Sequence, residues 1–214
     1  MGTGSGMGSG MFLIFNSIYI KYSMEDAIAA IDADLIDSLY RIVIDQKFDL
    51  NYEELFEEAV RRQAIACLSF LVHEHEKGRI HISLSHDRHI ISDIGDSASP
   101  ILLLVARIID PSRVIFAPVS TDNYKGVTDL VAIFGAEIAS DAAYDGAWMD
   151  YCSPGMYFHL LKLGASPRDI LDGAIDGQHL RPFLVAIDSG VILTQEDRRR
   201  IMRYPNSNLQ SFLD

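Results

Sequence analysis

Cysteine and basic residues are in short supply in this sequence of 214 residues. The two cysteines, Cys67 and Cys152, are too few for a disulfide framework. Both lie in apolar stretches, so we expect buried thiols in a reducing, cytoplasmic compartment. Lys and Arg number 18 against 30 Asp and Glu, which gives a formal net charge of −12. Such a surface repels phosphate backbones and anionic lipids, so we expect no nucleic acid and no membrane as partner.

Long apolar runs are also missing. The most apolar stretch, "MFLIFNSIYI" at 11–20, is too short to cross a bilayer as a helix. No basic region precedes it and no small-residue cleavage site follows it, as a signal peptide would require. We expect residues 11–23 to form an N-terminal capping segment. The ten residues before it, "MGTGSGMGSG", form a flexible Gly/Ser leader outside the fold.

Helical periodicity dominates what is present. Apolar residues recur at three- and four-residue spacing in stretches such as "ADLIDSLYRIVIDQ" and "NYEELFEEAVRRQ". Ser23 and Asn51 stand where helix N-caps are expected, and Pro100 stands in the first turn of another helix. Two segments, "GRIHISLS" (78–85) and "SRVIFAPVS" (112–120), are typical of short extended pieces. We therefore expect a mainly α fold of helix pairs joined by short loops.

Glycines indicate that the pairs repeat. Gly78, Gly135, Gly164 and Gly190 each follow an apolar helix, where glycine favours the left-handed conformation that ends helices. Gly135 and Gly164 are 29 residues apart, and Gly190 follows 26 residues later. A single helix pair cannot bury both of its apolar flanks, so repeated pairs are expected to stack on one another.

Four segments resemble the ankyrin-repeat family. They are "LFEEAVRRQAIACLSFL" (55–71), "VAIFGA" (131–136), "LLKLGASP" (160–167) and "GQHL" (177–180). No copy has that family's Thr-Pro-Leu-His opening, and the spacings vary. The resemblance implies a helical-hairpin solenoid of about five or six degenerate ankyrin-like repeats over 24–203, with short extended fingers and a C-terminal tail at 204–214. The alternative is a compact all-α bundle.

The resemblance implies a non-enzymatic protein–protein interaction module that binds through a concave face and fingers. Divergent ankyrin-like chains of this kind resemble effector, host-interaction and inhibitor or immunity proteins. The resemblance therefore implies a cytoplasmic protein, which could act in the cytoplasm of a host cell. Residues 21–60 hold eleven acids against three bases, which fits a partner protein with a basic patch. The candidate partner-binding residues are Glu53, Glu54, Glu57, Glu58, Arg79, His81, His86, Arg88, His89, Tyr144 and Trp148.

The histidine-rich stretch "HEHEKGRIHISLSHDRH" (73–89) allows a second hypothesis. His86, His89 and Asp93 would share one face of a helix, and these side chains are suitable ligands for a divalent metal. A metal-dependent hydrolase is therefore the alternative function. The sequence contains no His-Glu-x-x-His, Gly-x-Ser-x-Gly, phosphate-loop or dinucleotide motif. We therefore expect no catalytic residues, no metal and no cofactor, and the sequence leaves the oligomeric state open.

Overall fold

The computed structural model describes residues 22–45, 50–84, 87–204 and 208–213, and it confirms that the protein is mainly α-helical. The helices are α1 (Met24–Asp32), α2 (Ile36–Asp45), α3 (Tyr52–Arg61), α4 (Ile65–Glu76), α5 (Asp87–Asp93), α6 (Ser99–Val105), α7 (Pro111–Val114), α8 (Phe116–Ser120), α9 (Tyr124–Phe134), α10 (Glu137–Met149), α11 (Pro154–Lys162), α12 (Pro167–Gly177), α13 (Leu180–Asp188), α14 (Gln195–Met202) and the 3₁₀ helix η1 (Asn208–Phe212). No β-strand occurs among these residues.

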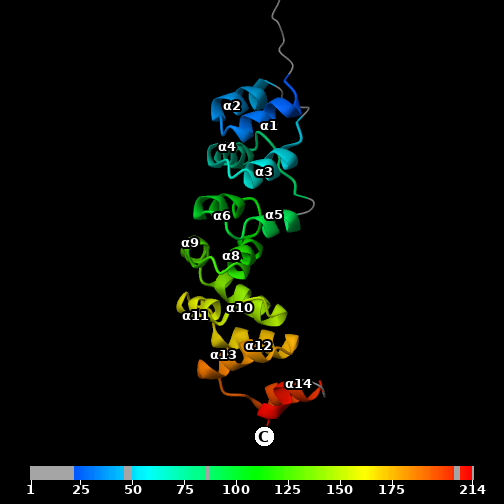
Figure 1. Ribbon diagram of the computed structural model, residues 1–214, viewed down its shortest axis with the longest axis vertical. Helices are drawn as coiled ribbons and strands as arrows, with labels where there is room; N and C mark the ends of the chain where they lie inside the picture. The colour runs from blue at the N-terminus through cyan, green and yellow to red at the C-terminus, as the bar shows by residue number, and fades with distance from the viewer. Residues whose placement is uncertain (1–21, 46–49, 85–86, 205–207, 214) are drawn as a thin grey trace, which may run out of the picture.

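The helices are stacked along the long axis of the molecule, with α1 near one end of the stack and α14 near the other (Figure 1). Consecutive helices pair, as in α1–α2, α3–α4, α10–α11 and α12–α13, and several helices also contact their counterpart in the next pair, as in α1–α3, α2–α4, α10–α12 and α11–α13. We call the side formed by α1, α3, α5, α8, α10, α12 and α14, with the short α7 beside α8 and α10, the first-helix face. The side formed by α2, α4, α6, α9, α11 and α13 is the second-helix face.

Side-chain caps begin the helices at the residues that the sequence indicated. The hydroxyl of Ser23 accepts from the backbone N–H of Asp26, whose carboxylate accepts from the Ser23 N–H at 2.8 Å. Thr194 begins α14 with the same reciprocal motif, and Asn51 caps α3. Pro100 lies in the first turn of α6, where its missing N–H has no helical partner to lose. Each side-chain cap stabilises its helix by about 1 kcal/mol.

Glycine follows four of the second helices, as expected. The φ angles of Gly78, Gly135, Gly164 and Gly190 are +67°, +101°, +106° and +91°. These glycines follow α4, α9, α11 and α13. An alanine at such a position would carry its Cβ into the following carbonyl, which is why glycine is favoured there.

A second left-handed series joins the two helices within pairs. Its members are Asp34, Gln63, Asp122, Asp150 and Gln178, all with positive φ. Asp122, Asp150 and Gln178 are spaced at 28 residues. The carboxylates bond to the next pair: Asp34 Oδ1 accepts from the Cys67 N–H at 3.0 Å, and the Ser153 hydroxyl donates to Asp122 Oδ1 at 2.6 Å. The aspartate turns at Asp34, Asp122 and Asp150 are therefore tied to the start of the second helix in the following layer.

The core is continuous and runs through the stack. Leu55, Phe56, Leu68, Tyr157 and Phe183 are among its fully buried side chains. The helices α10 and α12 approach so closely that a Cβ on Gly173 would lie 2.1 Å from the carbonyl oxygen of Tyr144. Glycine is therefore required at that contact.

The two cysteines are buried, free thiols, as their apolar surroundings indicated. Burial raises the pKa of each thiol, Cys67 and Cys152, to about 12. A thiol with so high a pKa carries almost no thiolate at neutral pH, so neither cysteine is suited to nucleophilic chemistry.

The prediction of an extended segment at 112–120 is wrong. These residues form α7 and α8, because Asp110 accepts from the Ser112 N–H at 3.0 Å and Pro111 supplies a helical first turn. Burial of Val114 and Val119 then outweighs the β preference of the segment.

In the described part of the 78–85 segment, Gly78 lies in a turn, residues 79–80 form a bend and residues 81–84 have no regular structure, so none of residues 78–84 forms a strand. Ile80 and Ile82 of this segment are buried on alternate positions, while His81 between them is exposed. Within 204–214, which the sequence marks as a tail, η1 packs on α13: Leu209 is buried and the Phe212 ring lies 5.4 Å from that of Phe183.

Candidate functional site

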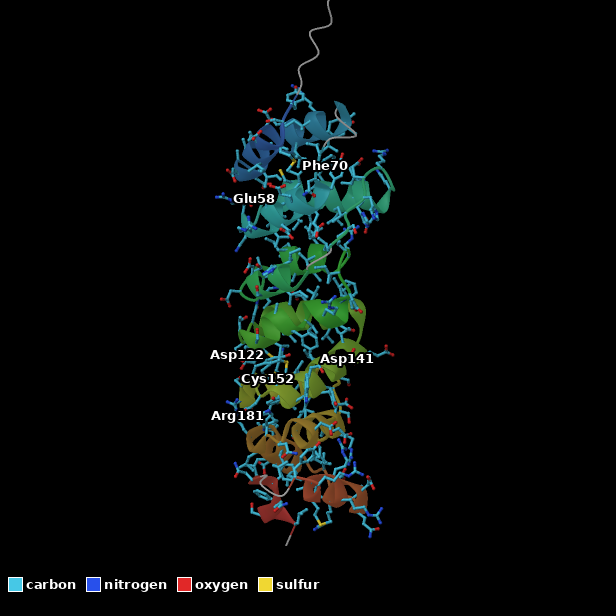
Figure 2. All side chains as sticks on the ribbon, turned by 90° about the vertical axis from the view of Figure 1, so that its right-hand side faces the viewer. Glu58, Phe70, Asp122, Asp141, Cys152 and Arg181 are labelled. Atoms are coloured by element: carbon cyan, nitrogen blue, oxygen red, sulfur yellow. The ribbon has the colours of Figure 1, made fainter. Side chains whose placement is uncertain are left out.

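The first-helix face carries a polar pocket where α7, α10 and α12 meet. Its volume is about 380 Å³, and it is lined by Ser112, Arg113, Phe116, Ser140, Asp141, Tyr144, Asp145 and Asp169. Figure 2 views the stack from the side on which α3, α5 and α14 lie in Figure 1, and Asp141 projects outward from the stack there. Tyr144, which the sequence indicated for partner binding, therefore forms part of a cavity wall.

Negative charge predominates in this pocket. The carboxylates of Asp141, Asp145 and Asp169 line it together with one guanidinium, that of Arg113. Burial raises the pKa of Asp145, and the neighbouring Asp141 raises it further. A cation between these two carboxylates would offset both effects, because it favours their ionised forms. The pocket is thus suited to a basic group.

Two aromatic rings, those of Tyr144 and Phe116, line the same pocket. The Tyr144 hydroxyl donates to Asp176 Oδ2 at 3.0 Å, which fixes the position of the ring. Burial, with the Asp176 contact, raises the pKa of Tyr144, so its hydroxyl stays protonated at neutral pH. Trp148 lies one turn further along α10 on the same helix face and is 49% exposed. The faces of such rings attract cations.

An ion-pair network holds the partner of Tyr144 in place. Asp176 also accepts from Arg200 Nη2 of α14 at 2.7 Å. Arg200 reaches Asp172 one turn earlier, and Arg168 donates to Asp172 Oδ2 from Nε at 3.0 Å. The α10–α12 wall of the pocket is therefore braced by charges from the next layer.

The acidic residues predicted to bind a partner, Glu53, Glu54, Glu57 and Glu58, lie on α3, several layers from Tyr144 (Figure 1). Glu54 is exposed, whereas Glu53 and Glu57 are half-buried. Glu58 is only 8% exposed, and it accepts from Arg62 Nε at 2.6 Å and from Arg61. The prediction that Glu58 belongs to an open binding face is wrong, because the arginines three and four residues later cover and neutralise it.

The histidine-rich stretch starts at the end of α4, as predicted, and several of its described side chains contact one another. The ring of His75 lies 5.8 Å from that of His81, and its Nδ1 accepts from the Ile82 N–H at 3.1 Å. Arg79 donates to both carboxylate oxygens of the buried Glu74 at 3.1 Å. Arg79 thus has an internal partner, and His81 remains exposed.

The metal hypothesis involves residues that the structure describes only in part. His86 and the side chain of Arg88 lie outside the described residues. His89 and Asp93 are exposed on α5, where the Ser92 hydroxyl donates to Asp93 Oδ1 at 3.3 Å. Among the side chains that are described, no group of three or more His, Cys, Asp or Glu could hold a metal ion. A metal-dependent hydrolase stays a prediction.

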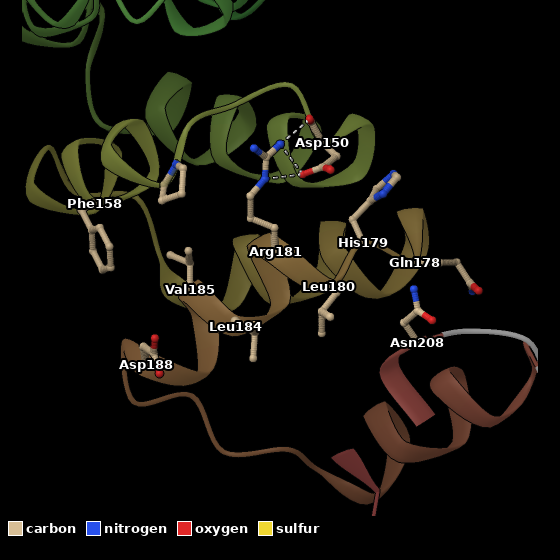
Figure 3. Close-up of a pocket in the computed structure, with 11 residues that line it drawn as sticks. Asp150, Phe158, Gln178, His179, Leu180, Arg181, Leu184, Val185, Asp188 and Asn208 are labelled. Carbon is tan, nitrogen blue, oxygen red and sulfur yellow. Dashed lines mark hydrogen bonds and ion pairs between the residues drawn. The ribbon is translucent and has the colours of Figure 1, made fainter. Parts of the chain in front are cut away.

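Sequence reasoning missed a larger pocket on the second-helix face (Figure 3). Its volume is about 610 Å³, and it is lined by Asp150, Pro154, Phe158, Gln178, His179, Leu180, Arg181, Leu184, Val185, Asp188 and Asn208. The sequence signal for it is the width of the apolar stripe on α13. Phe183 is buried in the core, whereas Leu180 and Leu184 extend the stripe beyond what the core covers.

Comparisons of the chain with family models, curated proteins and solved structures gave no match. In the described part of the chain, no helix has the length and apolar character needed to span a membrane.

Proposed function

We propose that this chain is a non-enzymatic protein-interaction module, built as an ankyrin-like solenoid, that binds a basic segment of another protein on its first-helix face. The stacked pairs, the glycines that end the second helices and the 28-residue spacing of the left-handed turns support a solenoid over a compact bundle. The pocket at Tyr144 is the observation that carries the binding proposal.

A Lys or Arg side chain of the partner fits the chemistry of this pocket. Its charge would pair with Asp141 and Asp145, and its alkyl stem would lie against the ring of Phe116 or Tyr144. A cation over an aromatic face contributes about 0.5 to 2 kcal/mol, more when water is excluded. The net charge of −12 would also steer a basic partner toward the chain and speed association.

The proposal includes a cytoplasmic location and a role as an effector, host-interaction protein or inhibitor. Buried free thiols at Cys67 and Cys152 fit a reducing compartment, which supports the cytoplasm. A binding module suits an effector, a host-interaction protein or an inhibitor, each of which acts by occupying a surface of its partner.

Charge reversal on the pocket tests the proposal. The partner would be captured from lysate with the full chain, purified, and its Kd measured by calorimetry from about 50 to about 300 mM NaCl. Asp141→Lys, at an exposed position on the pocket wall, is expected to weaken binding by about tenfold or more. It is also expected to flatten the salt dependence of the Kd, because the main attractive charge contact is lost.

The matched control is Asp96→Lys, an exposed residue in the turn between α5 and α6. It changes the net charge equally but lies away from the Tyr144 pocket, so the Kd is expected to change by about twofold at most. Equal weakening by Asp96→Lys and Asp141→Lys would show that only total charge matters. Binding that is indifferent to both substitutions would reject the first-helix face as the site.

A further inference from the structure

The large pocket on the second-helix face exists because the last layer of the stack is incomplete. In the layers before it, the second helices α9, α11 and α13 have 11, 9 and 9 residues. In the last layer, the corresponding position on α13 is taken by η1, which has 5 residues. Since η1 is too short to cover α13, an open groove of about 610 Å³ remains between α11, α13 and η1 (Figure 3).

The floor of this groove is apolar. Phe158 of α11 is 45% exposed and Leu184 of α13 is 37% exposed. Leu180, one turn before Leu184, adds to the same wall, and all three side chains line the groove (Figure 3). Leu180 and Leu184 lie at i and i+4 on one helix face, which is how a helix presents itself to a parallel or antiparallel neighbour.

Charges at the rim of the groove are not balanced. Arg181 donates to Asp150 Oδ1 from Nε at 3.1 Å and from Nη2 at 2.9 Å, so those two charges neutralise each other. Asp188, two turns after Arg181 on α13, is exposed and has no ion-pair partner among the described residues. A ligand that fills the apolar floor therefore meets one unpaired carboxylate at its edge.

We infer that this groove binds an amphipathic helix of a partner protein, with apolar side chains against Phe158, Leu180 and Leu184 and a basic residue facing Asp188. A helix is the expected occupant because second helices of neighbouring layers pack against each other elsewhere in the stack, as α11 does on α13. The bound helix would complete the last layer in the same way.

Charge argues that the occupant is a different protein. A second copy of this chain would bring another net charge of −12 to a rim that is already acidic. The apolar segment at 11–20 precedes α1, and α1 lies at the end of the stack opposite to this groove, so that segment is not proposed as the occupant (Figure 1). A basic amphipathic helix is thus the occupant that matches both the floor and the rim. The groove lies on the face opposite the Tyr144 pocket, so either site can fail while the other holds.

The test uses the full chain and a labelled, amidated peptide of sequence AKALAKALAKALKA, in which leucines recur at i and i+4 and lysines lie on the other face. Binding would be followed by fluorescence anisotropy, and methyl NMR shifts would report on Leu180, Leu184 and Val185. We expect saturable binding with the largest shifts at these methyl groups. Leu184→Ser and Phe158→Ser are each expected to raise the Kd of the peptide by about fivefold or more. Asp188→Lys is also expected to raise the Kd, and the increase should grow as the salt concentration is lowered.

The control variant is Ile133→Ser on α9, which removes a 61% exposed apolar side chain from the second-helix face in another layer. It should leave the Kd unchanged, and a peptide with glutamine in place of leucine should not bind. Circular dichroism melts would verify that each variant is folded. If Leu184→Ser is not folded, Phe158→Ser serves as the test variant in its place. Absence of binding, or equal loss in Ile133→Ser, would overturn the inference. If the wild-type chain sediments as a dimer and Leu184→Ser sediments as a monomer, the occupant is a second copy of this chain. That result would also overturn the inference of a helix from a different protein.

Discussion

Arg168 in α12 binds Asp197 in α14 across the boundary between the last two layers. Its Nη1 donates to Asp197 Oδ2 at 2.8 Å, and its Nη2 contacts the other carboxylate oxygen. The Asp197 side chain has no exposed surface, although it also caps α14 through Thr194. Burial alone would raise the pKa of Asp197, but the hydrogen bonds from Arg168 and Thr194 outweigh it and lower the pKa to about 2.

The first prediction is that Asp197→Asn destabilises the protein in a pH-dependent manner. A carboxyl with a lowered pKa contributes stability above its unfolded value of 3.8, and this contribution is lost as the pH falls from about 4 to about 2. We expect a loss of about 2 kcal/mol at neutral pH that shrinks in this acid window. Urea unfolding at several pH values measures it. Glu196→Gln, at the exposed neighbour, should change stability by less than about 0.5 kcal/mol. A loss from Asp197→Asn that is constant with pH would contradict the role of the charge.

The second prediction concerns the tie between Asp34 and α4. The Asp34 carboxylate accepts from the N–H groups of Ala66 and Cys67, and its φ is +48°. Asp34→Ala removes the acceptor but keeps the left-handed backbone, and alanine has no polar side chain whose hydrogen bonds offset the strain. The substitution should lower the free energy of unfolding by about 2 kcal/mol. Asp34→Asn keeps an acceptor oxygen and tolerates that conformation, so it should cost about 0.5 kcal/mol or less. Urea midpoints compare them, and equal losses would exclude the cap as the cause.

The third prediction uses the close approach of α10 and α12. In Gly173→Ala the new methyl would lie 2.1 Å from the carbonyl oxygen of Tyr144, and backbone cannot move aside as a flexible side chain can. We expect at least about 3 kcal/mol of destabilisation from this overpacking. Gly78→Ala meets no atom within 4 Å and bears only the strain of φ +67°, about 1 kcal/mol. Thermal melts that rank the two variants in the opposite order would contradict the helix contact.

The fourth prediction follows from the raised pKa of Asp145. The folded state holds that proton more tightly than the unfolded state, so the ionised carboxylate costs stability once the pH exceeds the folded pKa. Asp145→Asn should therefore be more stable than the wild type at neutral pH. The difference should vanish below the unfolded value of 3.8, where both states are protonated. Urea unfolding across that range checks the sign; a variant that is less stable at neutral pH would show that the carboxylate is favourably paired.

Features with strong local chemistry were predictable from the sequence. The N-caps Ser23 and Asn51 and the glycine that ends α11, Gly164, are encoded within one or two residues of where they act. The aromatic pair Tyr144 and Trp148 was found because large aromatic side chains on a helix are either core or binding residues, and both prove accessible in part.

Features that depend on another layer were not predictable. Glu58 is an exception, because its ion pairs are local: it is buried, but its partners Arg61 and Arg62 follow three and four residues later, so the pairing was visible in the sequence. The turn residues Asp122 and Asp150 carry no glycine, so their left-handed conformation is visible only once the next layer supplies Ser153 and Arg181 as partners. The groove on α13 arises from what η1 fails to cover, and no pattern within α13 states how long its neighbour is.

The two buried thiols can each report local opening of the stack. Cys67 lies in the first turn of α4 and Cys152 lies just before α11, several layers away, and both side chains are fully buried in the folded stack. In a stack that is held by nearest-neighbour contacts, one region can open while the rest stays folded. The rates at which a thiol reagent labels Cys67 and Cys152 would therefore report separately how often the layers around each cysteine open. The natural cysteines serve for this measurement, so no substitution is needed.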